Sequence, residues 1–318
     1  MKPKIIVTRD IPDEVESKLK DFFQVSFNRE DKVFEKEILR KAMENADGIV
    51  CTVTDSITDE LLSLTRKKVK IIANIGVGVD HIDLQSAKEN NVIITNTPDV
   101  LTEATVDIAT LLLLSITRNA FLAEKMLRQG EWKGFSLTEN LGVDVRGKTL
   151  GIVGMGRIGK AFARRAHEVF GMKVLYYNRS PVKDLEFKAS VRFDLDALLE
   201  ESDVISLHLS SDEGNKNFLS KNRMKKIKAS SFLINTSRGD VIDQEALTDL
   251  LEKKKISGAG LDVFLNEPNV PLRLRQLSNV TLYPHIGSAT HETRTKMGIL
   301  AVENLIAFFD KQRVINQL

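Results

Sequence analysis

The sequence has little cysteine, little imbalance of charge and no long hydrophobic run, and each shortage excludes a class of protein. Its one cysteine, Cys51, excludes an internal disulfide and a metal site built from several thiolates. Lysine and arginine number 46 against 44 aspartate and glutamate, which argues against a nucleic-acid or anionic-membrane partner. The longest apolar run, within residues 108–116, is too short for a membrane span, and no secretory signal is evident. We therefore expect a cytoplasmic protein without a metal.

The 318 residues are enough for two domains. Short apolar segments alternate with segments of helical spacing, which is typical of parallel sheets covered by helices on both faces. The expected strands are residues 4–8, 25–27, 48–53, 69–75, 92–95, 149–153, 173–177, 203–209, 231–235, 258–263 and 280–282. The expected helices are residues 12–23, 31–45, 58–65, 102–118, 121–130, 160 onward, 196–201, 243–253 and 292–310. The predicted fold class is α/β with doubly wound, Rossmann- or flavodoxin-like parallel sheets.

The stretch TLGIVGMGRIGKAFARRA, residues 149–166, predicts a dinucleotide site. A short apolar strand leads into a G-x-G-x-x-G turn at Gly154, Gly156 and Gly159, and helical spacing follows. In a dinucleotide-binding βαβ unit the first glycine permits the tight turn and the second lets the backbone approach a pyrophosphate. The third lets the helix pack against the strand. Because another strand is expected at residues 173–177, the whole unit is present.

The end of that next strand bears on the choice of cofactor. NAD sites usually place Asp or Glu there, roughly 20 residues after the glycines, to bind the ribose 2′-hydroxyl. This sequence has Asn178, Arg179 and Ser180 instead. Since an acidic group would repel a 2′-phosphate and Arg179 offers a fixed charge, we predict NADP with NADPH preferred. The alternative is that Arg179 is an ordinary solvated arginine and that NAD binds.

The segment NIGVGVDHID, residues 74–83, follows another expected strand. Gly76 and Gly78 allow a loop whose N–H groups can point at an anion. Asp80 could equally be the N-cap of the next helix. His81 has no partner recognisable in the sequence, and we interpret it as structural.

Two helices, residues 102–118 and 121–130, lie outside the nucleotide-binding pattern. The first is apolar nearly all round, so it must be buried in a core or against another subunit. Trp132, the only tryptophan, follows the second. We interpret the pair as the surface of a homodimer.

Three polar residues follow the later strands: Arg238 in NTSRGD, Glu267 in NEP and His285 in PHIGSAT. Loops after parallel strands gather at one edge of the sheet, so the three could meet above a nicotinamide. Reduction of a 2-keto acid needs such a set. Arginine binds the carboxylate, histidine gives the proton and a carboxylate orients the histidine. His208 and Glu245 are as polar and as near to strands, and spacing alone does not choose among them.

The motifs together resemble those of the D-isomer-specific 2-hydroxyacid dehydrogenases, and most of all the glyoxylate/hydroxypyruvate reductases. The resemblance runs through NIGVGVDHID, NTPDVLTEATVD, GKTLGIVGMGRIG, NTSRGDVID, GAGLDVF, NEP and PHIGSAT. It implies that Arg238 binds substrate and that Glu267 pairs with His285 in catalysis. The further substrate contacts it implies are Val53, Val77, Gly78 and Ser288. The cofactor contacts it implies are Gly154, Met155, Gly156, Arg157, Ile158, Gly159, Tyr177, Asn178, Arg179, Ser180, Leu209, Ser210, Thr236, Ser237, Asp262 and Gly287.

The resemblance also implies the domain organisation and the reaction. An NAD(P)-binding Rossmann domain, residues 99–287, is expected to be inserted into a substrate domain, residues 1–98 plus 288–318, with the active site in the cleft. The expected reaction is reduction of a small 2-keto acid, glyoxylate or hydroxypyruvate. Alternatives are a 2-ketogluconate reductase, a D-lactate dehydrogenase or a phosphoglycerate dehydrogenase. A dinucleotide-sensing corepressor-like protein is a more distant alternative.

Two stretches depart from the family pattern. Ser210 stands where relatives commonly have a proline after LHL, which puts the rigidity of that loop in question. The segment between Pro268 and Val280 contains the basic run PLRLRQ, which we expect to be a solvated loop.

Overall fold

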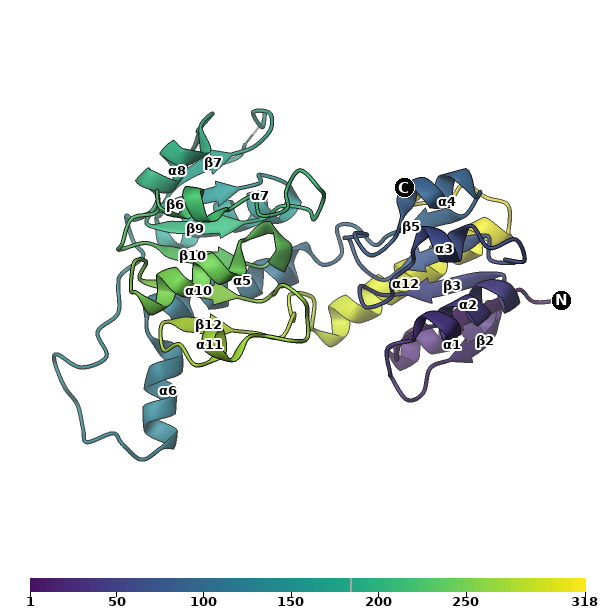
Figure 1. Cartoon of the computed structure of the whole chain (residues 1–318), viewed down its shortest axis with the longest axis horizontal. Coiled ribbons are helices and arrows are strands. Elements are labelled where there is room, and N and C mark those ends of the chain that lie inside the picture. The colour runs from purple at the N-terminus through teal and green to yellow at the C-terminus, as the bar shows by residue number, and fades with distance from the viewer. Residues whose placement is uncertain (184) are drawn as a thin grey trace. The chain divides into compact units, whose positions relative to one another are not determined.

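The structure, a computed structural model, describes residues 1–183 and 185–318. These residues form two compact units. Unit 1 consists of Met1–Leu101 and Ser288–Leu318, and unit 2 is the inserted segment Thr102–Gly287. Each unit contains one sheet with helices packed on both faces (Figure 1). The α/β fold with one domain inserted into the other is therefore confirmed.

The sheet of unit 1 has five parallel strands in the order β2-β1-β3-β4-β5. These are β1 (Lys4–Val7), β2 (Gln24–Phe27), β3 (Gly48–Cys51), β4 (Ile71–Asn74) and β5 (Ile93–Thr95). The helices are α1 (Asp13–Phe22), α2 (Lys36–Asn45), α3 (Asp59–Leu62), α4 (Leu84–Glu89) and α12 (His291–Phe309). α1 and α12 cover one face, and α2, α3 and α4 cover the other. Every residue of β3 and β4 is buried, which explains their unbroken apolar character.

Unit 2 has seven parallel strands in the order β12-β11-β10-β9-β6-β7-β8. They are β6 (Thr149–Val153), β7 (Lys173–Tyr177), β8 (Ala189–Val191), β9 (Val204–Leu207), β10 (Phe232–Asn235), β11 (Gly258–Leu261) and β12 (Val280–Leu282). The α-helices are α5 (Thr102–Thr117), α6 (Ala120–Arg128), α7 (Arg157–Phe170), α8 (Leu195–Glu201), α9 (Lys221–Met224), α10 (Gln244–Glu252) and α11 (Leu272–Arg275). α5 and α7 pack on one face, whereas α8, α9, α10 and α11 pack on the other.

Most expected elements form within a few residues of their predicted ends, and the exceptions are short. The strand β8 and the helix α9 were not predicted, and the helix expected over residues 31–45 begins only at Lys36. The prediction that PLRLRQ is a solvated loop is wrong. Leu274 of α11 is fully buried in the core of unit 2, and Arg273 pairs with Asp249 and Glu252 of α10.

α6 and the segment after it, residues 129–144, project from the sheet of unit 2 (Figure 1). α6 has no buried residue, although its partner α5 is buried along most of its length. Among the residues described, no single helix is long and apolar enough to cross a membrane, although α5 and α6, bent by 70°, together have that length and composition. The cytoplasmic location expected above stays a prediction.

Candidate active site

The glycine turn of unit 2 has the shape of a phosphate cradle. A Cβ on Gly159 would stand 2.1 Å from the carbonyl oxygen of Gly154, so only glycine lets α7 start this close to β6. A Cβ on Gly156 would instead meet no atom within 4 Å, so the space above the turn is open. Within the described ranges no side chain caps the N-terminus of α7, and a helix start of this kind favours an anion. These features fit a dinucleotide pyrophosphate.

The end of β7 carries the three residues on which the cofactor prediction depends. Arg179 and Ser180 are exposed. Asn178 is engaged within unit 2. Its Oδ1 accepts a hydrogen bond from the N–H of Met155 at 3.2 Å, and its Nδ2 donates to the carbonyl of Ser180 at 2.9 Å. Asn178 thus ties the β7 loop to the glycine turn, while Arg179 supplies the exposed charge.

The other implied cofactor contacts in unit 2 follow the carboxyl ends of strands of the same sheet. Leu209 and Ser210 come after β9, Thr236 and Ser237 after β10, and Gly287 after β12. Thr236 is buried, and its Oγ1 has no hydrogen-bond partner among the described residues. A bound ligand would supply the hydrogen bond that this buried hydroxyl lacks.

The loop of Ser210 is held by hydrogen bonds where relatives commonly have a proline. The Oγ of Ser210 donates to Asp212 at 3.0 Å, and the Nδ2 of Asn215 donates to the Ser210 carbonyl at 3.0 Å. The amide N–H of Asn215 also donates to Asp212, at 3.0 Å. This network restrains the loop by side chains.

Arg238, Glu267 and His285 follow β10, β11 and β12, and the structure brings the last two into contact. The Nδ1 of His285 lies 2.7 Å from Oε2 of Glu267, with each side chain one-third exposed. The other carboxylate oxygen of Glu267 accepts the N–H of Phe264 at 2.9 Å. The contact occupies Nδ1 and leaves Nε2 of His285 for chemistry.

The carboxyl group of Glu267 is influenced by the positive charge of Arg238 as well as by His285. Burial raises the pKa of this carboxyl, but the hydrogen bond and charge of His285, the N–H of Phe264 and the charge of Arg238 outweigh it. The net pKa of Glu267 lies below its usual value, so the group is an anion near neutral pH.

Close backbone packing joins the Arg238 turn to the Glu267 loop. A Cβ on Gly239 would stand 1.9 Å from the carbonyl carbon of Phe264, so only glycine fits. Asn235, buried at the end of β10, accepts hydrogen bonds from the N–H and Oγ of Ser237 at 3.0 and 2.7 Å. Its Nδ2 donates to the carbonyl of Arg238 at 2.7 Å. The hydrogen bonds of Asn235 and the close contact between Gly239 and Phe264 thus fix the turn that presents Arg238.

Asp262 anchors the loop that presents His285. Its main-chain carbonyl accepts the N–H of His285 at 2.8 Å, and its two carboxylate oxygens accept the N–H groups of Ile286 and Gly287 at 2.8 Å each. His285 itself has a φ of 54°, in the left-handed region that costs a non-glycine residue energy. Three hydrogen bonds to one aspartate hold it there.

His208 and Glu245, which spacing alone could not exclude as catalytic candidates, have surroundings that differ from those of His285 and Glu267. Burial lowers the pKa of His208 to about 4, and its Nε2 lies 2.9 Å from Oγ of Ser206. A neutral histidine in this position is a poor proton donor. Glu245 is exposed in the first turn of α10. Among residues 1–183 and 185–318, neither has a carboxylate–imidazole contact like that of Glu267 and His285.

In unit 1 the implied substrate contacts follow β3 and β4. Val53 is exposed in the turn after β3, whereas Val77 and Gly78 are half-buried after β4. Ser288, which precedes α12, accepts the N–H of Thr290 through its carbonyl at 2.8 Å. The N-cap of α4 is Asp83, which accepts the N–H of Ser86, so Asp80 does not cap that helix. His81 has a partner that the sequence did not indicate, since its Nε2 lies 3.1 Å from Oδ1 of Asn74.

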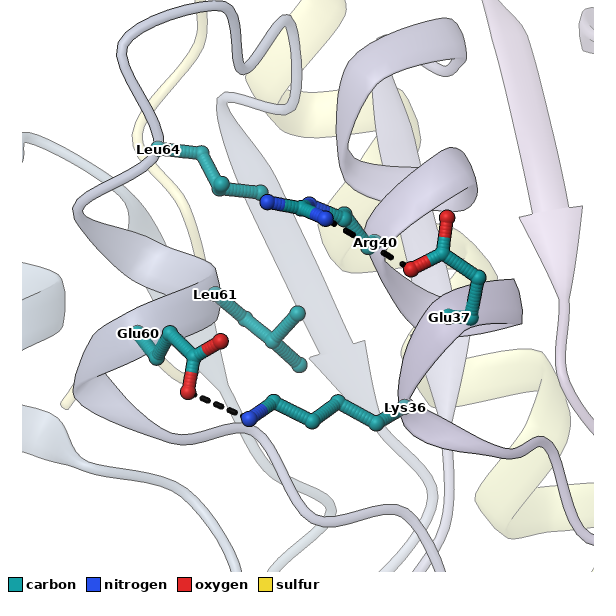
Figure 2. Close-up of a pocket in the computed structure, with 6 residues that line it drawn as sticks. All are labelled: Lys36, Glu37, Arg40, Glu60, Leu61 and Leu64. Atoms are coloured by element: carbon teal, nitrogen blue, oxygen red, sulfur yellow. Dashed lines mark hydrogen bonds and ion pairs between the residues drawn. The ribbon is translucent and has the colours of Figure 1, made fainter.

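A cavity of about 250 Å³ lies between α2 and α3 of unit 1 (Figure 2). Its charged side chains pair with one another, Lys36 with Glu60 and Arg40 with Glu37. Leu61 and Leu64 complete the lining. An open depression whose charges are already paired offers no nucleophile, acid or base to a substrate, and we assign it no catalytic role.

Comparison with known proteins adds to this geometry. Residues 110–287 match the NAD binding domain of the D-isomer specific 2-hydroxyacid dehydrogenases. A glyoxylate reductase from Thermococcus litoralis is 43% identical over 313 residues, which cover 97% of this chain and 94% of that protein. The crystal structure of a glyoxylate reductase from Paecilomyes thermophila matches with a TM-score of 0.89 at 32% identity, covering 100% of this chain and 98% of that one. An NADPH-dependent glyoxylate/hydroxypyruvate reductase from Sinorhizobium meliloti, in complex with NADP and malonate, matches with a TM-score of 0.87 at 33% identity, covering 100% and 97%.

Proposed function

The chain belongs to the D-isomer specific 2-hydroxyacid dehydrogenase family, and we propose that it reduces glyoxylate or hydroxypyruvate to the corresponding 2-hydroxy acid, D-configured where C2 is a stereocentre, with NADPH preferred over NADH. It is an NAD(P)-dependent oxidoreductase like the rest of that family. The observation that carries the proposal is the 2.7 Å contact between His285 and Glu267, with the charge of Arg238 acting on the same carboxylate.

Each of the three side chains has one task in this reaction. The glycine turn and the β7 loop of unit 2 would hold the nicotinamide cofactor, which would supply the hydride for the keto carbon. Arg238 binds the substrate carboxylate and polarises the neighbouring carbonyl. His285 donates a proton from Nε2 to the carbonyl oxygen, so the product is the neutral alcohol. Glu267 holds the imidazole by Nδ1 and favours its protonated form until the proton leaves.

The substrate preference is tested by following NADPH oxidation with glyoxylate, hydroxypyruvate, pyruvate and 2-ketogluconate, and repeating the panel with NADH. We expect the highest kcat/KM with glyoxylate or hydroxypyruvate. A preference for pyruvate or 2-ketogluconate would move the enzyme elsewhere in the family. No turnover of the panel with either cofactor would contradict the proposed reaction and favour a dinucleotide sensor.

The preference for NADPH rests on the exposed Arg179 and Ser180 after β7, in a segment whose residues 178–180 include no Asp or Glu. The related Sinorhizobium meliloti enzyme is itself named as NADPH-dependent. We expect Arg179→Ala to raise the KM for NADPH about ten-fold or more while leaving the KM for NADH nearly unchanged. Equal KM values for the two cofactors in the unaltered enzyme would refute the preference.

We further propose that the enzyme is a homodimer joined through α6 and residues 129–144. Phe135, Leu137 and Leu141 are 89%, 80% and 67% exposed in this segment, and Trp132 is exposed beside them. So much apolar surface on one projecting segment is typical of a subunit interface. Sedimentation should show a dimer, and Phe135→Ser with Leu137→Ser should shift it toward monomer. A monomeric unaltered protein would contradict the proposal.

A further inference from the structure

A buried asparagine lies directly beneath the glycine turn of unit 1. Asn74, the last residue of β4, is 1% exposed. Its Nδ2 donates hydrogen bonds to the carbonyls of Gly76 at 3.1 Å and Gly78 at 3.0 Å. One side-chain amide therefore binds two carbonyls of the same turn and fixes their direction.

The third carbonyl of the turn is held by another asparagine. The Nδ2 of Asn96, just after β5, donates to the carbonyl of Val77 at 3.0 Å. The backbone N–H of Thr97 adds a second bond to the carbonyl of Gly76, also at 3.0 Å. All three carbonyls of the turn, from Gly76 to Gly78, are thus engaged by unit 1.

The direction of the carbonyls sets the direction of the N–H groups. In a trans peptide the C=O and the N–H point opposite ways. Since the carbonyls of Gly76 and Val77 point toward Asn74 and Asn96, the N–H groups of Val77 and Gly78 point away from them. Throughout the described part of the chain, neither N–H donates to any protein acceptor. Two adjacent, half-buried donors of this kind form a site for a carboxylate.

The orientation of the Asn74 amide is itself determined. The Nε2 of His81 lies 3.1 Å from Oδ1, and the Sγ of Cys51 lies 3.8 Å from the same oxygen. The carbonyls of Gly76 and Gly78 can only accept, so Nδ2 faces the turn and Oδ1 faces His81, and the tautomer of His81 with a proton on Nε2 donates to that oxygen. Packing is close here as well, since a Cβ on Gly76 would stand 3.2 Å from Nδ2.

We propose that Asn74 is a positioning residue that holds the turn at the carbonyls of Gly76 and Gly78 and so orients the N–H of Val77, while Asn96 orients the N–H of Gly78 through the Val77 carbonyl, so that the two donors bind the substrate carboxylate. His81 contacts Oδ1 of Asn74 on the side away from the turn. This inference rests on the proposed function, which gives the substrate its carboxylate. Neither Asn74 nor His81 touches the substrate. Their loss should therefore weaken carboxylate binding before it affects hydride transfer.

The test uses Asn74→Leu, which keeps the volume and removes the amide, in the full-length enzyme. We expect the KM for glyoxylate to rise about ten- to a hundred-fold, as two hydrogen bonds are lost, while kcat changes far less. The dissociation constant of NADPH, measured by its fluorescence, should stay unchanged. Oxalate binding to the NADPH-loaded enzyme, measured by calorimetry, should weaken by the same factor as glyoxylate binding.

Two further variants separate positioning from simple destabilisation. His81→Phe leaves Asn74 in place but removes the donor to Oδ1, and should raise the KM for glyoxylate by less than Asn74→Leu. His81→Gln keeps a donor and should restore most of the affinity. If Asn74→Leu does not fold, the difference between the two His81 variants still decides the question.

Asn28→Leu is the matched control. Asn28 is also in unit 1, and its Nδ2 also bridges two carbonyls, those of Thr8 and Lys32 at 2.8 and 2.6 Å. It should cost thermal stability without changing the KM for glyoxylate. The proposal is overturned if this control reproduces the Asn74 effect, or if Asn74→Leu binds oxalate like the unaltered enzyme. An enzyme that turns over no keto acid but loses oxalate binding in Asn74→Leu would refute the proposed function alone.

Discussion

Two turns of the molecule are built in the same way and present different chemistry. Each follows an interior strand of a parallel sheet, β4 in unit 1 and β10 in unit 2, and beneath each lies an asparagine that is 1% exposed. Asn74 binds the carbonyls of Gly76 and Gly78, whereas Asn235 binds the carbonyl of Arg238 and the N–H of Ser237. The first turn offers backbone N–H groups, and the second offers a guanidinium.

The difference determines how each turn can be damaged. A guanidinium or an imidazole can be deleted by one substitution, so unit 2 should show large losses from single changes. A backbone N–H cannot be deleted by changing a side chain. A substitution near the turn of unit 1 can only change the direction of its N–H groups. The resulting loss of activity should be smaller and should appear mainly as weaker substrate binding.

The largest effect should come from His285→Gln in unit 2. We expect kcat to fall about 10²- to 10⁴-fold because the proton donor is lost, with NADPH binding retained. Single-turnover kinetics and NADPH fluorescence measure the two quantities. If this variant kept full activity, His285 would not be the proton donor.

Arg238→Gln should follow in size. If the guanidinium binds the substrate carboxylate by charge-assisted contacts as proposed, kcat/KM for glyoxylate should fall about 10- to 100-fold or more. Arg238→Lys keeps the charge but not the fork, and should recover only part of the loss. Full recovery by lysine would mean that charge alone, without bidentate geometry, holds the substrate.

Asn235→Leu is the direct counterpart of Asn74→Leu. It should lower kcat as well as raise KM, because Arg238 also polarises the carbonyl that accepts hydride. A loss of about ten-fold in kcat/KM is expected from the hydrogen bonds removed. If the two variants gave the same division between kcat and KM, the contrast between the turns would fail.

The smallest expected effect is a pH-dependent change in thermal stability when Asp262 is replaced. Burial raises the pKa of Asp262 to about 6, although the N–H groups of Ile286 and Gly287 and the charge of His285 lower it. The folded protein therefore binds this proton more tightly than the unfolded chain, so the contribution is present at low pH and is lost as pH rises from about 4 to about 6. Asp262→Asn cannot titrate. Its Tm relative to the unaltered enzyme should rise by a few degrees across that interval, and a constant difference would contradict the shift.

Much of this architecture could be predicted because its signals are local. Continuous apolar runs such as Phe232–Asn235 predict buried parallel strands, and the spacing of Gly154, Gly156 and Gly159 predicts the turn before α7. The strand β8 was missed because it lies at the edge of the sheet, beside β7 alone. Its three residues are exposed or half-buried, so the sequence has no continuous apolar run there. α11 was missed because Leu274 is its single buried apolar residue, between two arginines, of which Arg273 pairs with α10.

The catalytic side chains could be proposed from motifs, but the residues that position them could not. Nothing in NIGVGVDHID distinguishes Asn74, whose amide binds the turn, from an ordinary polar residue at a strand end. The partner of His81 lies seven residues away in the sequence, across a turn whose shape only the structure supplies. Asp262 was expected to touch the cofactor, which stays a prediction. Its role in the His285 loop, where both carboxylate oxygens accept backbone N–H groups, was not foreseen.

Unit 1 is completed by the two ends of the chain. Ala301, Val302 and Leu305 of α12 are fully buried in the core that also contains Val15 and Leu19 of α1, and the N–H of Leu318 binds the carbonyl of Ile94 beside the sheet. A ribosome makes the strands of this sheet first and α12 last. Unit 2, encoded between them as one continuous segment, can fold while the first sheet still lacks one of the two helices that cover one of its faces. Part of the apolar face of this sheet therefore stays uncovered while unit 2 is made, until α12 follows.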